Sequence, residues 1–496
     1  MSFSTHLICA LCAALIWVTG LCLYRIFLHP LHRHPGPLLA TLTDWYAAYY
    51  TWRGDIHLKL REFHGTYGTI VRFGPNSISI NSYTGMSEIY STWANVVKAD
   101  AYSIMSASRH ILSTISCIDK KQHAAKRKVL ARLFTETALK GVEDRVLSYV
   151  DTFCASLSAA NQAGWGIAKD IAAWSDYLTL DIISDLCYGK AFGLLRAETH
   201  RYIPKVISCV SRRNAICFVQ PIIAKYKLDR IFLSTVSTQI RQFGSWIKDQ
   251  ADARKSAKNA GDSNDFFAHL STHQAGKGQS GLTPKEVWVE LLQLVIAGAD
   301  TTAVAISAVF FHLLRDPMAL SQATEEILST FQHLDDIRPG ALLRSCAFLH
   351  ACINESLRLS PRVTGLAPRK VLTGGINVDG VHFPEGTIIG SPIYTLHRNA
   401  TYFPQPDSFM PERRLQSQNG VDSSRVPFCP FSVGPRLCVA KRLALDEISV
   451  TVARTLYLYG MRLDEASSRK MEYQLKGWMT SGREGPFVQF KSRQQL

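Results

Sequence analysis

The sequence has few cysteines for its length, 12 among 496 residues, and they are spread along the chain. A scaffold held together by disulfide bonds needs a much higher density, so this class is excluded, and the thiols are expected to be mostly reduced and cytosol-facing. Charged residues make up only 19% of the chain and hydrophobic residues 47%, which excludes a disordered protein. The sequence therefore predicts a globular protein whose core is large enough to enclose a cofactor.

Several sequence motifs are also missing. The chain has no internal repeat, no zinc-ligand spacing and no nucleophile-elbow motif. No glycine-rich phosphate-binding loop follows a predicted strand, so the chain itself is not expected to bind a flavin or a nicotinamide. The 55 Lys and Arg exceed the 40 Asp and Glu by 15, but they form no recognisable nucleic-acid module. We therefore expect no nucleic-acid partner, and a basic face for a membrane or an acidic protein instead.

Charge is absent from residues 7–24, and extending this apolar run to residue 28 adds only Arg25. The run is long enough to cross a bilayer, and the long side chain of an arginine can reach the interface. A cleaved signal peptide is the alternative, but no Lys or Arg precedes the run and no small-residue cleavage site follows it. Basic residues such as Arg33 just after the run favour a single-pass anchor with the catalytic domain facing the cytosol. The endoplasmic reticulum membrane is the expected location.

The predicted domain organisation has three parts: an anchor at 1–28, a proline-rich hinge at 29–40 and one mainly helical domain at 41–496. Three prolines stiffen the hinge. Alternation predicts a β-hairpin within 70–80 and strands within 376–389, and residues 252–281 are predicted as a loop. Helical periodicity marks residues 120–134, 143–157, 179–188, 284–314, 317–331 and 341–359.

The apolar run at 291–314 could be interpreted as a second membrane span. Asp300 opposes insertion, because a carboxylate at the centre of a span costs roughly +2.5 to +3.5 kcal/mol. A helix that is apolar on all sides is also what the centre of a large soluble domain requires. The sequence therefore favours a central buried helix.

The string FSVGPRLC, which ends at Cys438, carries the strongest chemical signal. A cysteine thiolate that ligates a haem iron needs a rigid loop and a nearby cation for a haem propionate. Gly434 can shape such a turn, Arg436 supplies the cation, and Phe431 can cover the proximal side; a buried structural thiol is the alternative. The string resembles the haem-binding loop of the cytochrome P-450 family, except that Ala440 stands where the family usually has Gly.

The string AGADTT at 297–302 resembles a second signature of that family, which lies in its long central helix. The resemblance implies that Asp300 and Thr301 relay protons to bound dioxygen. The alternative is structural: a threonine bonded to its own helix and an aspartate held by a buried partner. A carboxylate in the middle of an apolar helix is expensive unless it is used, which favours the functional interpretation.

The string ESLR resembles a third signature, with Glu355 and Arg358 three residues apart on one helical face. Such pairs are commonly surface salt bridges of little energetic value. The family pairs them with a downstream arginine, and the string FMPER, which ends at Arg413, is similar to that segment. The resemblance implies a buried triad of Glu355, Arg358 and Arg413 around the haem loop, although Arg414 stands where the family often has an aromatic residue.

Three further cations resemble family residues that reach the haem propionates: His123 and Arg127, one helical turn apart, and Arg369 after the ESLR helix. Ordinary solvated cations are the alternative. Other basic residues could form a proximal face for an acidic reductase. These are Lys120, Lys121, Lys126, Lys128, Arg132, Lys441 and Arg442.

Together the matched segments identify the chain as resembling filamentous-fungal, microsomal cytochromes P-450. The resemblance implies a mainly α fold with a small β-rich part, and a single haem domain holding haem b through the thiolate of Cys438. It also implies a monooxygenase that uses O2 as co-substrate and NADPH indirectly, through NADPH–cytochrome reductase, with cytochrome b5 as a further candidate donor.

The implied substrate is a hydrophobic small molecule of fungal secondary metabolism, of terpenoid, polyketide or alkaloid type. Its contacts are expected in the regions 102–116, 203–223, 297–301, 363–367 and 478–481. Two alternatives stay open within the family: a haem-thiolate isomerase or dehydratase, and a desaturase or coupling enzyme. A non-catalytic haem-binding membrane protein is the alternative from another class.

Overall fold

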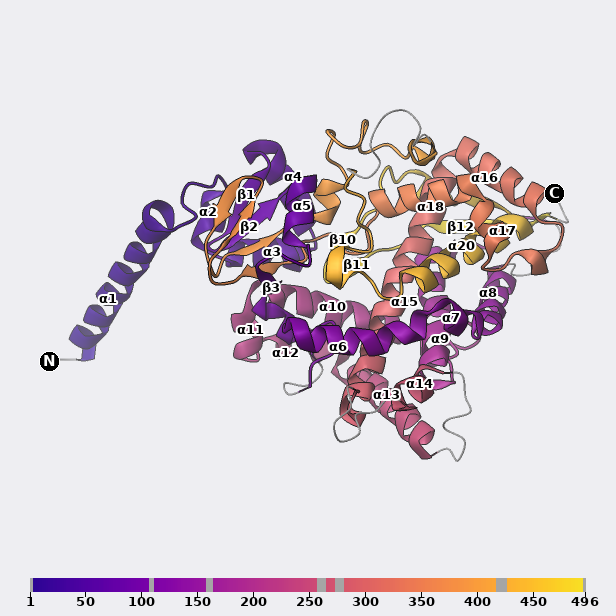
Figure 1. The fold of residues 1–496 in the computed structure, drawn as a ribbon, viewed down its shortest axis with the longest axis horizontal. Coiled ribbons are helices and arrows are strands. Elements are labelled where there is room, and N and C mark those ends of the chain that lie inside the picture. The colour runs from indigo at the N-terminus through magenta and orange to yellow at the C-terminus, as the bar shows by residue number, and fades with distance from the viewer. Residues whose placement is uncertain are drawn as a thin grey trace.

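The computed structural model describes residues 3–106, 111–157, 164–256, 265–272, 281–415 and 426–493. The fold is mainly helical, with a small β-rich part at the end of the body nearest the N-terminus (Figure 1). Residues 107–110 of one predicted substrate region, and 257–264 and 273–280 of the predicted loop, lie outside the described residues.

The N-terminal apolar segment forms helix α1 (Phe3–Leu23), continued by the π-helical turn η1 (Tyr24–Leu28). Neither contains a buried residue, and Figure 1 shows α1 projecting alone from the body. Together they form a helix long and apolar enough to cross a membrane. This helix is the candidate membrane anchor.

The chain after η1 is docked on the body. Leu31 is completely buried in the same apolar cluster as Ile78 and Phe383, and the ring of His34 stacks on that of Phe383 at 5.3 Å. The guanidinium of Arg72 donates to the carbonyl oxygen of Arg25 at 2.9 Å. The first half of the proline-rich segment is thus held on the body by side-chain packing, next to a hydrogen bond at Arg25.

The predicted hairpin is present as β1 (Ile70–Gly74) and β2 (Ser77–Ile80), which pair antiparallel. The largest sheet has the order β1-β2-β8-β5-β3, in which only β2 and β8 run parallel. The predicted strands within 376–389 are also present. The strands other than β1 and β2 are β3 (Val96–Lys98), β4 (Lys169–Asp170), β5 (Arg369–Val371), β6 (Ile376–Val378), β7 (Val381–Phe383), β8 (Ile388–Gly390), β9 (Tyr459–Leu463), β10 (Lys476–Gly477), β11 (Ser481–Gly482) and β12 (Phe487–Ser492).

The central helix is α15 (Pro284–Arg315), as predicted. It starts with a capping box, in which the Thr283 hydroxyl accepts from the Glu286 amide and the Glu286 carboxylate accepts from the Thr283 amide. It packs most extensively against α9 (Ile171–Tyr188), and also against α18 (Ala347–Leu359) and α20 (Lys441–Leu458). Its second half is buried, so this apolar run belongs to the protein core.

Two of the predicted elements are wrong in part. The predicted loop at 252–281 contains the end of α13 (Ser237–Ser256) and α14 (Phe266–Thr272), because Phe266, Phe267 and Leu270 are buried against the core. The helix predicted at 341–359 is broken at Cys346, where ψ is 78°. The Glu326 carboxylate then accepts from the first amides of α18, at 2.9 and 2.8 Å, and so starts a new helix.

Of the other predicted helices, those at 120–134, 143–157 and 317–331 are present with similar bounds, whereas the helix predicted at 179–188 begins earlier, at Ile171 of α9. The helices not yet named are α2 (Leu38–Leu42), α3 (Trp45–Arg53), α4 (Ile56–Tyr67), α5 (Tyr83–Ile89), η2 (Asp100–Met105), α6 (Lys120–Ala131), η3 (Arg132–Phe134), α7 (Glu136–Lys140), α8 (Glu143–Leu157), α10 (Ile203–Val219), α11 (Pro221–Lys225), α12 (Asp229–Leu233), η4 (Ser234–Val236), α16 (Pro317–Thr330), η5 (Leu334–Asp336), α17 (Ala341–Ser345), α19 (Ile393–Leu396), η6 (Pro411–Arg414), η8 (Gly434–Arg436) and α21 (Glu465–Ser468).

Candidate active site

The loop before α20 presents Cys438 on a tightly bonded turn. The Cys438 amide donates to the carbonyl oxygen of Phe431 at 2.9 Å, and the Leu437 amide donates to that of Gly434 at 3.0 Å. Gly434 has φ of 68°, and a Cβ there would lie 2.0 Å from the carbonyl oxygen of Tyr90. Only glycine satisfies both conditions. The two backbone hydrogen bonds hold the turn in the fixed shape that a metal-binding thiolate needs.

The second part of the candidate site is the middle of α15, which carries Asp300 and Thr301. The hydroxyl of Thr301 donates to the carbonyl oxygen of Ala297 at 2.7 Å, one turn back in the same helix. Gly298 lies against α9, where a Cβ would be 3.1 Å from Cγ1 of Ile183, and this contact accounts for a residue without a side chain. Asp300 and Thr301 are half-buried, whereas residues 302–311 are buried. The middle of the helix therefore borders open space.

The carboxylate of Asp300 is held by the hairpin of β10 and β11. The hydroxyl of Thr480 donates to one carboxylate oxygen, and Nη1 of Arg483 lies 3.2 Å from the other. Nη2 of Arg483 also lies 2.6 Å from the carboxylate of Asp176 on α9. Two carboxylates thus share one guanidinium, whose side chain is only 5% exposed.

Charge in this network is unbalanced, with two acids for one base. Burial raises the pKa of Asp176 to about 6; the charge of Arg483 opposes this shift and that of Asp300 adds to it. Burial opposes the charge of Arg483, yet Asp176 and Asp300 raise its pKa above the ordinary value. The guanidinium therefore stays charged and holds both carboxylates.

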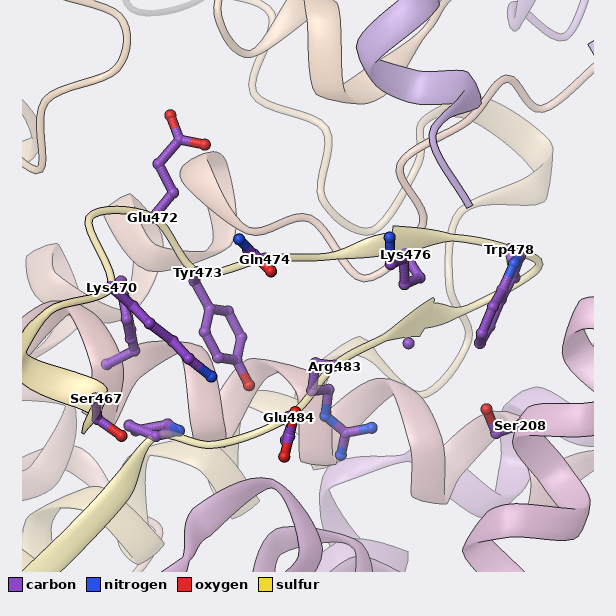
Figure 2. Close-up of a pocket in the computed structure, with 13 residues that line it drawn as sticks. Ser208, Ser467, Lys470, Glu472, Tyr473, Gln474, Lys476, Trp478, Arg483 and Glu484 are labelled. Carbon is purple, nitrogen blue, oxygen red and sulfur yellow. The ribbon is translucent and has the colours of Figure 1, made fainter. Parts of the chain in front are cut away.

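Two cavities adjoin this network and share Ser208, Gly482 and Arg483. The one of about 190 Å³ reaches Asp300 and Asp176, and the other is about 290 Å³. Figure 2 shows the larger cavity, with Trp478 and Arg483 pointing from the hairpin toward the helix that carries Ser208. Three of the predicted substrate regions, 203–223, 297–301 and 478–481, meet here.

The structure brings together Glu355, Arg358 and Arg413. Glu355 is fully buried on α18, and its carboxylate accepts from Nε and Nη2 of Arg358 at 3.0 and 2.7 Å. Nε of Arg413 donates to the same carboxylate at 2.8 Å. Arg358 also donates to the carbonyl oxygens of His397, Pro406 and Ser408. The cluster ties α18 to the segment that precedes the Cys438 loop.

Arg414 joins this cluster and was not predicted to do so. Its Nε lies 3.6 Å from the carboxylate of Glu355, and its guanidinium lies over the ring of Phe428 at 3.9 Å. Burial lowers its pKa to about 10, against the attraction of Glu355. It occupies the place of an aromatic residue by stacking on one, which a sequence position alone does not reveal.

Five basic residues lie around Arg436 of the Cys438 loop: the predicted His123, Arg127, Arg369 and Arg436, and Lys98 of β3, which sequence reasoning missed. Burial, with Arg436 and Arg369 nearby, lowers the pKa of Lys98 to about 7. Burial, with Arg436 and Lys98 nearby, lowers that of His123 to about 3. Among the described residues no carboxylate forms an ion pair with any of the five. The buried carboxylate of Glu290 acts on Lys98 but accepts its hydrogen bonds from Thr114, so these basic residues, of which His123 is neutral, have no paired anion in the described part of the chain.

The residues fit a haem. The two propionates of a haem are anions that these basic residues could hold, and Cys438, on its hydrogen-bonded loop, could ligate the iron. Arg436 also fixes the loop to the chain before α6, since its guanidinium donates to the carbonyl oxygens of Cys117 and Ile118 at 3.2 and 3.3 Å.

The predicted basic face needs a correction. Lys126 is only 4% exposed, and its Nζ lies 2.6 Å from the Glu286 carboxylate, so it pairs α6 with α15 instead of facing solvent. Arg442 is held by Glu136 at 2.8 Å. The exposed members of the set are Lys120, Lys121, Lys128, Arg132 and Lys441.

Comparisons with known proteins identify the family of the chain. The model of the family "Cytochrome P450" matches residues 35–487. The chain is 33% identical over 489 residues to the cytochrome P450 monooxygenase atnE of Emericella nidulans, covering 95% of this chain and 94% of that protein. It is 32% identical over 483 residues to poxM of Penicillium oxalicum (96% and 93% covered) and 33% over 506 residues to apf7 of Gibberella fujikuroi (95% of each), both also named cytochrome P450 monooxygenases.

Proposed function

Because the chain belongs to the cytochrome P450 family, whose relatives are named monooxygenases, we propose that it oxidises a hydrophobic small molecule with O2 and with electrons from NADPH through a reductase. The observation that carries this proposal is the position of Cys438, on its glycine turn, beside a group of basic residues with which no carboxylate of the described chain forms an ion pair. Hydroxylation is the default reaction.

The haem would be held by Cys438 through its iron, and by Arg436, Arg369, His123 and Arg127 through its propionates. When bound, the haem supplies the activation of dioxygen and the electrons of the thiolate favour cleavage of the O–O bond. The protein would contribute the hydrogen-bonded loop and the counter-charges. The Glu355 cluster keeps the chain before the loop in place.

Protons would reach the site through Asp300 and Thr301. Asp300 is bonded to Thr480 and Arg483 at the wall of a polar cavity, which supports a path for protons from outside. Arg483 would orient the carboxylate, and Thr301 would pass a proton on when its hydroxyl leaves the carbonyl oxygen of Ala297.

The substrate class follows from the regions that meet at this cavity. The smaller cavity is lined mostly by polar side chains, among them Asp300, Lys205 and Thr480, and therefore suits polar substituents. The apolar residues of α15 on either side of the acid–threonine pair support an apolar body for the substrate. The named relatives come from filamentous fungi. We therefore place the enzyme in fungal secondary metabolism, with a terpenoid, polyketide or alkaloid substrate.

The partner and location follow from two surfaces. The exposed basic residues of α6 and η3, with Lys441, lie near the Cys438 loop and suit an acidic reductase or cytochrome b5. The anchor helix α1 is accompanied by exposed apolar side chains on α2, α3 and α12, which suit a lipid surface. The endoplasmic reticulum, with the body on the cytosolic side, accommodates both.

The test compares metabolites of the native host carrying the wild-type protein, Cys438→Ala, or the control Cys346→Ala, which removes a buried thiol elsewhere. A hydroxylase predicts that only Cys438→Ala accumulates a precursor lighter than the lost product by one oxygen. If the product is lighter than the precursor by the mass of lost hydrogen, the enzyme is a desaturase or coupling enzyme. If the two masses are equal, it is an isomerase. Turnover without a reductase would contradict the proposed electron source.

A further inference from the structure

One buried arginine, Arg362, lies against the ring of Phe431 and is not among the residues proposed to bind the haem. Arg362 follows α18 and is 4% exposed. Its guanidinium lies 4.1 Å from the centroid of the Phe431 ring, and its Nη2 donates to the carbonyl oxygen of Pro430 at 2.9 Å. Its own carbonyl oxygen accepts from the amide of Ser481 at 2.9 Å, so the backbone is fixed from the other side.

The charge of Arg362 lacks a partner. Its Nε is buried and, among the described residues, has no hydrogen-bond partner and no carboxylate paired with it. Burial lowers its pKa to about 10, and the neighbouring ionisable group that opposes this shift is Cys438. A buried guanidinium with one carbonyl and one ring as partners is poorly compensated, which requires an anion nearby.

The charge of Arg362 interacts with Cys438 and not with the basic residues proposed to bind the propionates. The basic residues around Arg436 act on one another: Arg369 and Arg127 lower the pKa of Arg436, and Arg436 lowers that of Lys98. Arg362 takes no part in these interactions. Arg127 also acts on Cys438, but it is only half-buried, so solvent screens its charge more strongly.

We propose that Arg362 is a positioning residue for the electronics of the haem: its buried charge, held on the Phe431 ring, draws electron density from the Cys438 thiolate and raises the reduction potential of the iron. This inference rests on the proposed haem-thiolate function. Reduction adds one electron, and so one negative charge, to the haem site; a fixed cation in a low-dielectric region favours that state. The effect would ease the first electron transfer from the reductase.

The experiment is a spectroelectrochemical titration of the full-length holoprotein in detergent. Arg362→Gln removes the charge, Arg362→Lys keeps it, and Lys441→Gln is the matched control, because Nζ of the exposed Lys441 lies 5.7 Å from the same ring. At the midpoint potential of the wild type, we expect the ratio of reduced to oxidised protein to be about tenfold lower in Arg362→Gln. This corresponds to a shift of the midpoint by ~59 mV to more negative potential. Arg362→Lys and Lys441→Gln should stay near the wild type.

The absorbance of the carbon monoxide complex of each reduced protein separates the two hypotheses. A wild type without a thiolate-type band would refute the proposed function itself. A wild-type potential in Arg362→Gln with a normal band, or an equal shift in Lys441→Gln, would overturn the role of Arg362. If Arg362→Gln does not retain haem, Arg362→Met supplies a neutral side chain that packs on the ring. Loss of haem in both neutral variants, with retention in Arg362→Lys, would assign the charge to haem retention and also overturn the proposal.

Discussion

Replacing Glu355 by Gln should destabilise the protein severely, because it removes one charge and keeps the shape. The carboxylate accepts three short bonds from guanidinium groups, two from Arg358 and one from Arg413. Charge-assisted bonds contribute about 1.5–3 kcal/mol each, which would give a gross loss of ~4.5–9 kcal/mol. Arg358 keeps its backbone carbonyl partners and Gln keeps one acceptor, so we expect a net loss of about 3–5 kcal/mol.

The assay is urea unfolding of the full-length protein in detergent, with the haem-bound fraction measured alongside. A domain stability of roughly 5–15 kcal/mol makes such a loss large, so we also expect little haem incorporation into Glu355→Gln and none into Glu355→Ala. The control is Glu465→Gln, whose partner Arg469 is exposed, and it should cost under ~0.5 kcal/mol. A Glu355→Gln protein within ~1 kcal/mol of wild type and with normal haem content would refute the reasoning.

Three other predictions concern the loop and the proton path. Gly434→Ala should abolish haem binding, since its Cβ would meet the carbonyl oxygen of Tyr90; absorbance of the purified protein checks this. Asp300→Asn should lower product formation by roughly 10²-fold while NADPH consumption falls less, measured as the ratio of product to NADPH. Asp176 binds its proton more tightly in the folded than in the unfolded chain. The stability advantage of wild type over Asp176→Asn should therefore shrink as the pH rises from about 4 to about 6, measured by thermal unfolding, and a constant difference would contradict this.

The parts of the site that lie close together in sequence could be predicted from it. Glu355 and Arg358 share one helical turn, and Phe431 and Cys438 share one loop, so their spacing alone constrains their geometry. The partners of Asp300 could not be predicted: Asp176 and Arg483 lie far away in sequence, and only the packing of α9 and the β10–β11 hairpin against α15 brings them together. Lys98 was missed because a lysine in a short strand carries no sign of burial.

The fold was predictable where the hydrophobic residues of a segment follow one clear helical or strand periodicity. The apolar run of α15 and the alternation of β1 and β2 both stand out against their surroundings. Helix α14 was missed because its short apolar face lies between polar segments, and the break before α18 because the cap comes from a different helix, through Glu326. Both depend on contacts between elements, which a local pattern cannot express.

If α1 is inserted in a membrane as proposed, the docking of the chain after it would make the position of the body depend on bilayer thickness. Because Leu31 is buried and the guanidinium of Arg72 donates to the carbonyl oxygen of Arg25 in η1, the chain that follows α1 is held on the body. Helical rise is about 1.5 Å per residue, so a change in the apolar length of the anchor is transmitted to the body as a change in tilt and depth. In the proposed membrane orientation, the first 28 residues would therefore set the height at which apolar molecules leave the lipid for the interior.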